Sequence, residues 1–84
     1  MDASGPTPCP LDDISSRESA HIIALNGGRR LVSRLAALGF VPGARVSMVQ
    51  NYGRGPLIVL VRQTRIALGR GEATRIIVQR EMPA

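Results

Sequence analysis

The sequence predicts a mainly β domain, built as a small, partly open antiparallel barrel of about five strands with one short α-helix. Three observations support this fold class. The chain has 84 residues, and a domain of this size buries only about 60–65% of the surface of its unfolded form. Short β-branched and aliphatic segments alternate with turns that contain Gly and Pro. Phe40 and Tyr52 are the only aromatic residues, so Leu, Ile, Val and Ala must build the core.

The domain is expected to span residues 11–80, between two tails. Residues 1–10 are rich in Pro, Ser and Gly and nearly free of large apolar side chains, which predicts a flexible tail. A short C-terminal tail is expected at 81–84. The first 20 residues lack the basic opening and apolar stretch of a signal peptide. We therefore expect a cytoplasmic protein, and its single cysteine, Cys9, excludes an internal disulfide.

Strands are expected where apolar residues follow the period of an extended chain. Residues 20–25 are β-branched and aliphatic, and residues 45–50 alternate polar with apolar side chains, as in a half-buried strand. The continuous aliphatic run at 57–61 indicates a strand that is covered on both faces or that closes a small barrel. Two shorter strands are expected at 66–68 and 75–79.

Glycine and proline mark the connections between these strands. Gly55 and Pro56 end the 51–56 loop and are interpreted as structural turn residues. The GRGEA segment at 69–73 is expected to be a one-turn break. Neither glycine-rich segment has the Lys-Ser/Thr ending of a phosphate-binding loop, so both are interpreted as turns.

A short helix is expected to begin near Arg29. Leu31, Leu35 and Leu38 are spaced at i, i+4 and i+7, so they share one face, which we expect to pack on the core. Gly39 stands where a helix commonly ends with a positive φ, a conformation that glycine adopts at little cost.

The chain is expected to reverse direction directly after this helix. Phe40 can fold back onto Leu35 or Ala36. Pro42 and Gly43 suit the two central positions of a type II turn, because Pro fixes the first φ and Gly accepts the positive φ that follows. The sequence therefore predicts a tight corner between the helix and the next strand.

The helix also carries an arginine-rich face. All 11 basic residues of the chain are Arg, and the formal net charge is +5. The guanidinium group binds carboxylates and phosphates, so this charge favours an acidic protein, nucleic acid or an anionic membrane surface as partner. The candidate partner-binding residues are Arg29, Arg30 and Arg34 on the helix and Phe40, Val41 and Pro42 at the corner.

No catalytic, cofactor-binding or metal-ligating residues are expected. His21 lies in an apolar strand and is interpreted as a surface or barrel residue. Cys9 and His21 do not have the paired spacing of a zinc site. Asp12 and Asp13 are adjacent, and neighbours in an extended chain point to opposite sides, so we expect turn and cap roles for them. The sequence thus predicts a protein that is not an enzyme.

Several motifs occur in an order that carries a family resemblance. The most specific is Leu35-Ala36-Ala37-Leu38-Gly39 followed by Pro42-Gly43. Gly55-Pro56 before the continuous strand supports it, as do Ala67-Leu68 and Glu72-Ala73 before the last strand. Over about residues 10–78 the chain resembles the FeoA family, small cytosolic accessory proteins of bacterial ferrous-iron transport. Family members often place Gly after the strand arginine, whereas this chain reads Arg62-Gln63-Thr64-Arg65, so a hairpin of different length or turn type is expected there.

The resemblance implies an SH3-like barrel and a function in transport. It implies a non-enzymatic protein that binds the cytosolic part of a FeoB-type membrane GTPase transporter and modulates Fe2+ uptake, and that reaches the membrane only through this partner. An association with transition-metal ions is also implied, and we expect it to be weak or indirect because this chain shows no ligand set. No cofactor and no specific nucleic acid are expected. The alternative hypothesis is a small nucleic-acid-binding or metal-responsive regulatory barrel, whose charge would give salt-sensitive binding.

Overall fold

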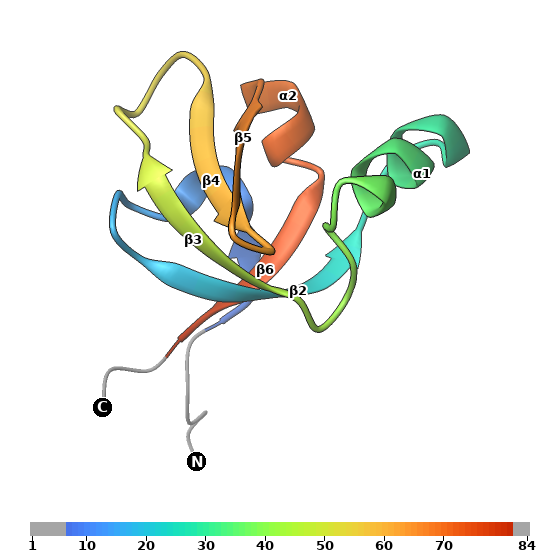
Figure 1. The fold of residues 1–84 in the computed structure, drawn as a ribbon, viewed down its shortest axis with the longest axis horizontal. Helices are drawn as coiled ribbons and strands as arrows, with labels where there is room; N and C mark the ends of the chain where they lie inside the picture. Colours follow the sequence, from blue (N-terminus) through green and yellow to red (C-terminus); the bar gives the residue numbers. More distant parts are fainter. Residues whose placement is uncertain (1–6, 82–84) are drawn as a thin grey trace.

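The computed structural model describes residues 7–81, which form a strongly curved antiparallel sheet with helical segments at its ends (Figure 1). The elements in chain order are β1 (Cys9–Pro10), the 3₁₀ turn η1 (Leu11–Asp13), β2 (Ser19–Leu25), α1 (Arg29–Ala37), β3 (Arg45–Gln50), β4 (Leu57–Val61), β5 (Thr64–Leu68), α2 (Arg70–Ala73) and β6 (Ile76–Arg80). The strand order is β1-β6-β2-β3-β4-β5. The predicted mainly β class is confirmed. The structure adds a sixth strand, β1, and a helical turn, α2, in the predicted break at 69–73.

The first strand lies in the segment predicted as the N-terminal tail. Cys9 pairs with Val78 and Pro10 with Ile77, both in β6. The predicted boundary at residue 11 is therefore wrong, because a proline-rich segment can still pair as an edge strand, where a missing N–H is tolerated. Glu81, placed in the predicted C-terminal tail, donates its amide to the Ser19 carbonyl at 3.1 Å. Residues 1–6 and 82–84 of the two predicted tails lie outside the described residues.

The core occupies the inside of the curved sheet. On β3, Val46 and Met48 are buried between more exposed neighbours, which confirms the alternation predicted for 45–50. The fully enclosed core also takes its members from β2, β6 and the helical segments. Its largest side chains are Phe40, Leu11, Ile14, Leu35, Met48, Leu57, Leu68, Ile76, Val46, Val59, Val61 and Val78. As expected, aliphatic residues dominate.

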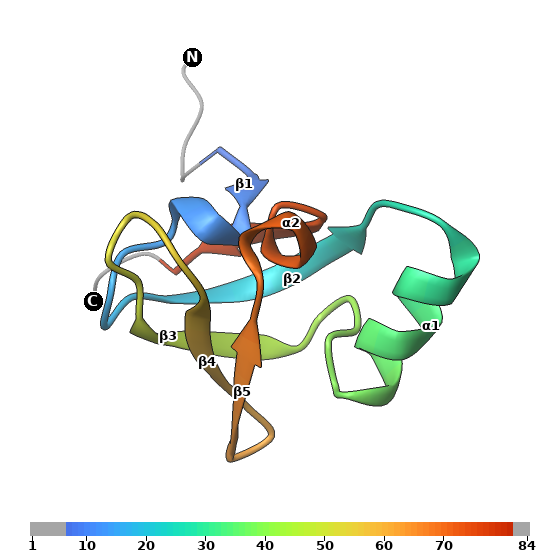
Figure 2. The same cartoon turned by 90° about the horizontal axis from the view of Figure 1, so that it is seen from above.

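The continuous aliphatic run of β4 is covered on one face only. Leu57, Val59 and Val61 are buried, whereas Ile58 is half-buried and Leu60 is exposed. The sequence left two alternatives for this run, a strand covered on both faces or one that closes a small barrel. The structure has the second, because within residues 7–81 no second layer packs outside β4 (Figures 1 and 2).

The barrel has a seam between its edge strands, β1 and β5, which are not neighbours in the sheet. The turn η1 and the helix α2 lie against each other there (Figure 2). Helical segments therefore close the seam in place of backbone pairing, and the barrel is partly open as predicted. No helix within residues 7–81 is long and apolar enough to cross a membrane.

The β4–β5 hairpin has a two-residue loop. Val61 pairs with Thr64, and the intervening Arg62 and Gln63 have φ values of 52° and 64°. Positive φ at both central residues defines a type I′ turn, which normally contains Asn-Gly. Of the two alternatives expected here, a longer hairpin is therefore excluded, and the two-residue loop is a type I′ turn without glycine.

Candidate interaction surface

Helix α1 projects from one end of the barrel (Figures 1 and 2). Its only fully buried residue is Leu35, and Leu31 is half-buried against the core. Leu38 is 43% exposed, so its predicted place on the core-facing side is wrong. The three leucines share one face, but the core encloses only Leu35 completely, while Leu31 packs partly against it and Leu38 stays partly exposed.

The end of α1 has the geometry that the sequence predicts. Gly39 has a φ of +108°, and its amide donates to the Ala36 carbonyl while the Phe40 amide donates to the Leu35 carbonyl, both at 3.0 Å. This pair of bonds is a Schellman motif, which satisfies two carbonyls that the helix end leaves free. Leu35 and Phe40 are both 0% exposed, so the accompanying apolar contact is part of the core.

Phe40 is therefore a core residue and not the partner contact that the sequence suggested. The same backbone bond that ends α1 directs the ring inward, where its large apolar area is most stabilising. Val41 is half-buried and Pro42 is exposed. Gly43 has a φ of +91°, and the Ala44 amide donates to the Val41 carbonyl at 3.0 Å, which confirms the predicted type II turn.

The helix arginines are exposed, as predicted, but they differ in their partners. Arg34 forms an ion pair with Glu72 of α2, with both side chains partly exposed to solvent. Glu72 also accepts the Gly69 amide at 3.1 Å, so one carboxylate caps α2 and holds α1. An exposed pair of this kind contributes about 0–1 kcal/mol. Arg29 and Arg30 lie in the first turn of α1, which has no acidic residue.

Two further arginines reach α1 from distant parts of the chain. A Cβ on Gly39 would lie 3.1 Å from Cδ of Arg62, so the Arg62 stem lies over the end of α1. A Cβ on Gly27 would lie 4.0 Å from Cδ of Arg75. Neither arginine was predicted to lie at this helix, because both are distant from it in sequence. The only hint in the sequence was the glycine that each arginine packs against, Gly39 for Arg62 and Gly27 for Arg75.

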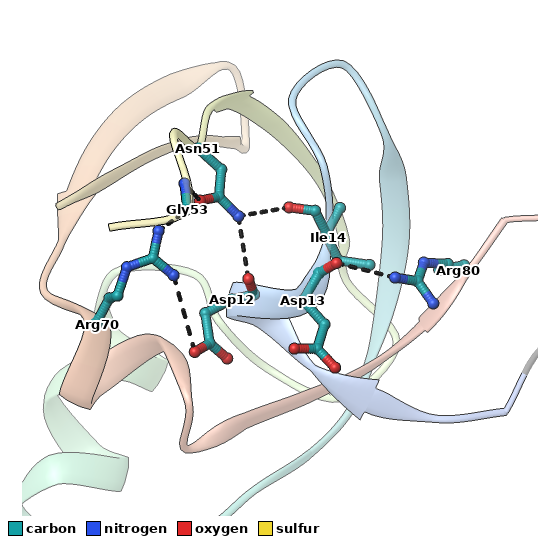
Figure 3. Close-up of polar contacts among 7 residues, drawn as sticks. All are labelled: Asp12, Asp13, Ile14, Asn51, Gly53, Arg70 and Arg80. Carbon is teal, nitrogen blue, oxygen red and sulfur yellow. Dashed lines mark hydrogen bonds and ion pairs between the residues drawn. The ribbon is translucent and has the colours of Figure 1, made fainter. Parts of the chain in front are cut away.

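A polar cluster, shown in Figure 3, joins the 51–56 loop to the seam of the barrel. Asn51 Nδ2 donates to the carbonyls of Asp12 and Ile14, at 3.0 and 2.7 Å. Asn51 Oδ1 accepts the amide of Gly53 at 2.9 Å and a guanidinium N–H of Arg70. The cluster fixes η1, α2 and the loop relative to one another.

The two aspartates lie in the turn η1, as the sequence predicts, but no side-chain hydrogen bond caps η1. Arg70 Nη1 lies 3.9 Å from Asp12 Oδ2 across the seam, and Arg80 donates to the Asp13 carbonyl at 2.9 Å. These contacts support the fold, whereas Asp12 Oδ1 and Arg70 Nε are buried without a hydrogen-bond partner among the described residues. We assign the cluster no chemistry beyond this structural role.

His21 and Cys9 lie in surroundings without a ligand set. His21 Nδ1 is 3.6 Å from Glu81 Oε2, and Arg45 Nε donates to the same oxygen at 2.5 Å. This hydrogen bond from Arg45 lowers the pKa of the Glu81 carboxyl below its ordinary value. Burial raises the pKa of the Cys9 thiol. Within residues 7–81 no three His, Cys, Asp or Glu side chains gather as metal ligands.

The fold and the corner can be compared with known proteins. A family model described as the FeoA domain matches residues 9–80. The chain belongs to the FeoA family. The match begins at Cys9, the first residue of β1, and ends at Arg80, the last residue of β6.

Relatives of this FeoA chain have been characterised by sequence and by structure. A Methanocaldococcus jannaschii protein named Fe(2+) transport protein A is 29% identical over 70 residues, 83% of this chain and 84% of the relative. The chain is also similar to Stenotrophomonas maltophilia FeoA, whose crystal structure complexed with zinc is described as that of an SH3 domain protein. The two are 34% identical in sequence, and the match covers 89% of this chain and 98% of the other, with a TM-score of 0.76. A crystal structure of an iron uptake regulatory protein (FeoA) is 27% identical over 89% of this chain and all of its own, with a TM-score of 0.84.

The FeoA fold also occurs within larger proteins. A manganese-dependent transcriptional repressor superposes with a TM-score of 0.80 over 95% of this chain and 45% of its own, at 15% identity. At this identity the likeness shows the fold alone. The family resemblance predicted an SH3-like barrel. This prediction is confirmed, because the chain superposes on the S. maltophilia protein, which is described as an SH3 domain protein.

Proposed function

We propose that this protein is a non-enzymatic, cytoplasmic accessory protein of Fe2+ transport that binds the cytosolic part of a FeoB-type transporter and modulates uptake. The observation that carries the proposal is the FeoA family match across the whole barrel, from residue 9 to residue 80. Relatives named for Fe(2+) transport and iron uptake support the same role.

The shape of the molecule supports a binding role. Helix α1 presents Arg29, Arg30 and Arg34 to solvent and buries only Leu35 completely. Pro42 is exposed on the adjoining turn. An exposed helix that carries several arginines is well placed to contact another protein, because arginine is enriched at protein–protein interfaces.

The proposal assigns iron binding to the partner rather than to this chain. The S. maltophilia relative is described as complexed with zinc, but in the part of this chain that the structure describes no three side chains of metal-ligating type come together. We therefore expect any association of this protein with Fe2+ to be weak or indirect.

The test is the initial rate of Fe2+ uptake under iron limitation in cells that lack this gene. We expect a reduced rate that the wild-type gene restores and that a Leu35→Asp variant does not, because a buried unpaired charge prevents folding. A Leu38→Asp variant is the matched control, since Leu38 is 43% exposed, and we expect it to fold and to restore uptake. Failure of a folded Leu38→Asp variant to restore uptake would indicate that Leu38 contacts the partner directly. Unchanged uptake in the gene-deleted cells contradicts the proposal.

A further inference from the structure

The excess positive charge of this protein is unevenly distributed. Four of the five carboxylates within residues 7–81 form ion pairs with arginine: Asp12 with Arg70, Glu18 with Arg80, Glu72 with Arg34, and Glu81 with Arg45. The other seven of the 11 arginines make no ion pair with a described residue. The net charge of +5 is thus carried by particular, uncompensated side chains.

Three of these arginines belong to chain segments that meet where β2 leads into α1. Arg29 and Arg30 open the helix. Arg75, 45 residues after Arg30, reaches the same place because its carbonyl accepts the Asn26 amide at 2.7 Å and its side chain passes beside Gly27. We call Arg29, Arg30 and Arg75 the arginine cluster. Glu72 neutralises Arg34 and so marks the limit of the cluster along the helix.

An apolar surface adjoins the cluster. A hollow of about 350 Å3, open to solvent, is lined by Arg30, Leu31 and Arg34. Leu31 is half-buried, and its Cδ2 would lie 3.0 Å from a Cβ on Gly27, so any larger residue there would displace it. The hollow therefore offers an apolar surface between guanidinium groups, which suits an apolar side chain flanked by carboxylates.

A polypeptide fits this surface better than nucleic acid does. Single strands bind to barrels through aromatic side chains on which bases stack, but Phe40 is 0% exposed. Tyr52, the other aromatic residue, belongs to the 51–56 loop at the end of the barrel opposite α1 (Figures 1 and 2). Arginine also binds a carboxylate with two parallel hydrogen bonds, which gives a protein partner a fixed orientation.

We propose that the arginine cluster and the adjoining Leu31 hollow receive an acidic segment of the transporter's cytosolic part, with an apolar side chain of that segment seated on Leu31. This inference rests on the proposed function, since it takes the transporter as the partner. It adds Arg75 to the binding surface and specifies the charge of the segment that is bound.

The experiment compares two variants with equal charge. Arg30→Glu/Arg75→Glu alters the cluster, and Arg17→Glu/Arg54→Glu alters two unpaired arginines of the 15–18 turn and the 51–56 loop, at the opposite end of the barrel. Each variant lowers the net charge from +5 to +1, because each Arg→Glu change removes two units. We measure how tightly the wild type and each variant bind the purified cytosolic domain of the FeoB-type transporter from the same organism. The dissociation constants are determined between 50 and 300 mM NaCl, about the range in which charge contacts are screened. Thermal unfolding verifies that both variants fold.

We expect the cluster variant to bind about tenfold or more weakly and with less salt dependence than the wild type, while the control variant stays within about twofold of the wild type. Equal weakening of both variants would mean attraction by net charge alone and would overturn the inference. Wild-type binding by the cluster variant would also overturn it, but would leave the proposed function standing. If the wild-type protein neither binds this domain nor restores Fe2+ uptake, both proposals fail.

A membrane surface is the remaining occupant to exclude. The same proteins are floated with vesicles that contain phosphatidylcholine alone or with phosphatidylglycerol. We expect no difference between the wild type and the cluster variant. A different result would overturn the inference: the wild type and the control variant float with the anionic vesicles, the cluster variant does not, and all three bind the transporter domain equally. The cluster would then bind lipid headgroups.

Discussion

The Phe40 amide donates a 3.0 Å hydrogen bond back to the Leu35 carbonyl, and both side chains are completely buried. One backbone contact therefore ends α1, reverses the chain and places two large core residues. Leu38, which lies between them in the sequence, is 43% exposed.

The two leucines at the end of α1 should differ sharply in their contribution to stability. We expect Leu35→Ala to lower the free energy of unfolding by about 2–5 kcal/mol, because it leaves a cavity in the core. Leu38→Ala should change it by less than about 0.5 kcal/mol, as an exposed substitution usually does. Urea unfolding followed by circular dichroism measures both. Equal losses would show that α1 packs with a different phase.

Gly39 and Gly43 should respond differently to alanine. Both have a positive φ, +108° and +91°, so each Gly→Ala change costs about 1–2 kcal/mol of backbone strain. At Gly39 the new Cβ would also lie 3.1 Å from Arg62 Cδ, whereas at Gly43 no atom lies within 4 Å. We expect the larger loss for Gly39→Ala, and an Arg62→Ala change added to it should recover part of the excess. No recovery in denaturant titrations would contradict the packing of Arg62 over Gly39.

Asn51 should contribute more to stability than its place in a loop suggests. Asn51→Ala removes the donor to the carbonyls of Asp12 and Ile14 and the acceptor for Arg70. Leaving such groups without partners costs about 1–3 kcal/mol, and this loss should appear as a lower midpoint of thermal unfolding. Tyr52→Ala is the neighbouring control, because Tyr52 is 76% exposed; a comparable loss there would show that the whole loop, and not the polar cluster, is responsible.

Glu81 should give the protein a specific sensitivity to acid. The hydrogen bond from Arg45 lowers the pKa of Glu81 in the folded state, so its stabilising effect is complete above the ordinary glutamate pKa of about 4.3. The effect is lost as the pH falls from there through the lowered pKa. NMR titration of the Glu81 carboxyl should show the lowered pKa, and Arg45→Gln should return it toward the ordinary value. A Glu81 pKa that is ordinary in the wild type would contradict this assignment.

The sequence by itself determined the features that depend on local backbone geometry. Gly39 ends α1 and Pro42-Gly43 forms a type II turn because only certain residues adopt these φ values at low cost. The alternating apolar run predicted β3 and the continuous apolar run predicted β4. Both predictions depend on local geometry, because side chains of an extended chain point to alternate faces.

At α1 and its neighbouring segments, the tertiary structure decided which side chains lie in the core and which arginine-bearing segments meet. Local spacing gives Leu31, Leu35 and Leu38 the same face, but only the packing of α1 on the rest of the barrel decides that Leu35 is enclosed and Leu38 is not. Phe40 was expected at a partner surface and lies in the core because the end of α1 turns it inward. Arg75 joins Arg29 and Arg30 through the pairing of distant segments, and such long-range proximity has no periodicity by which a single sequence would reveal it.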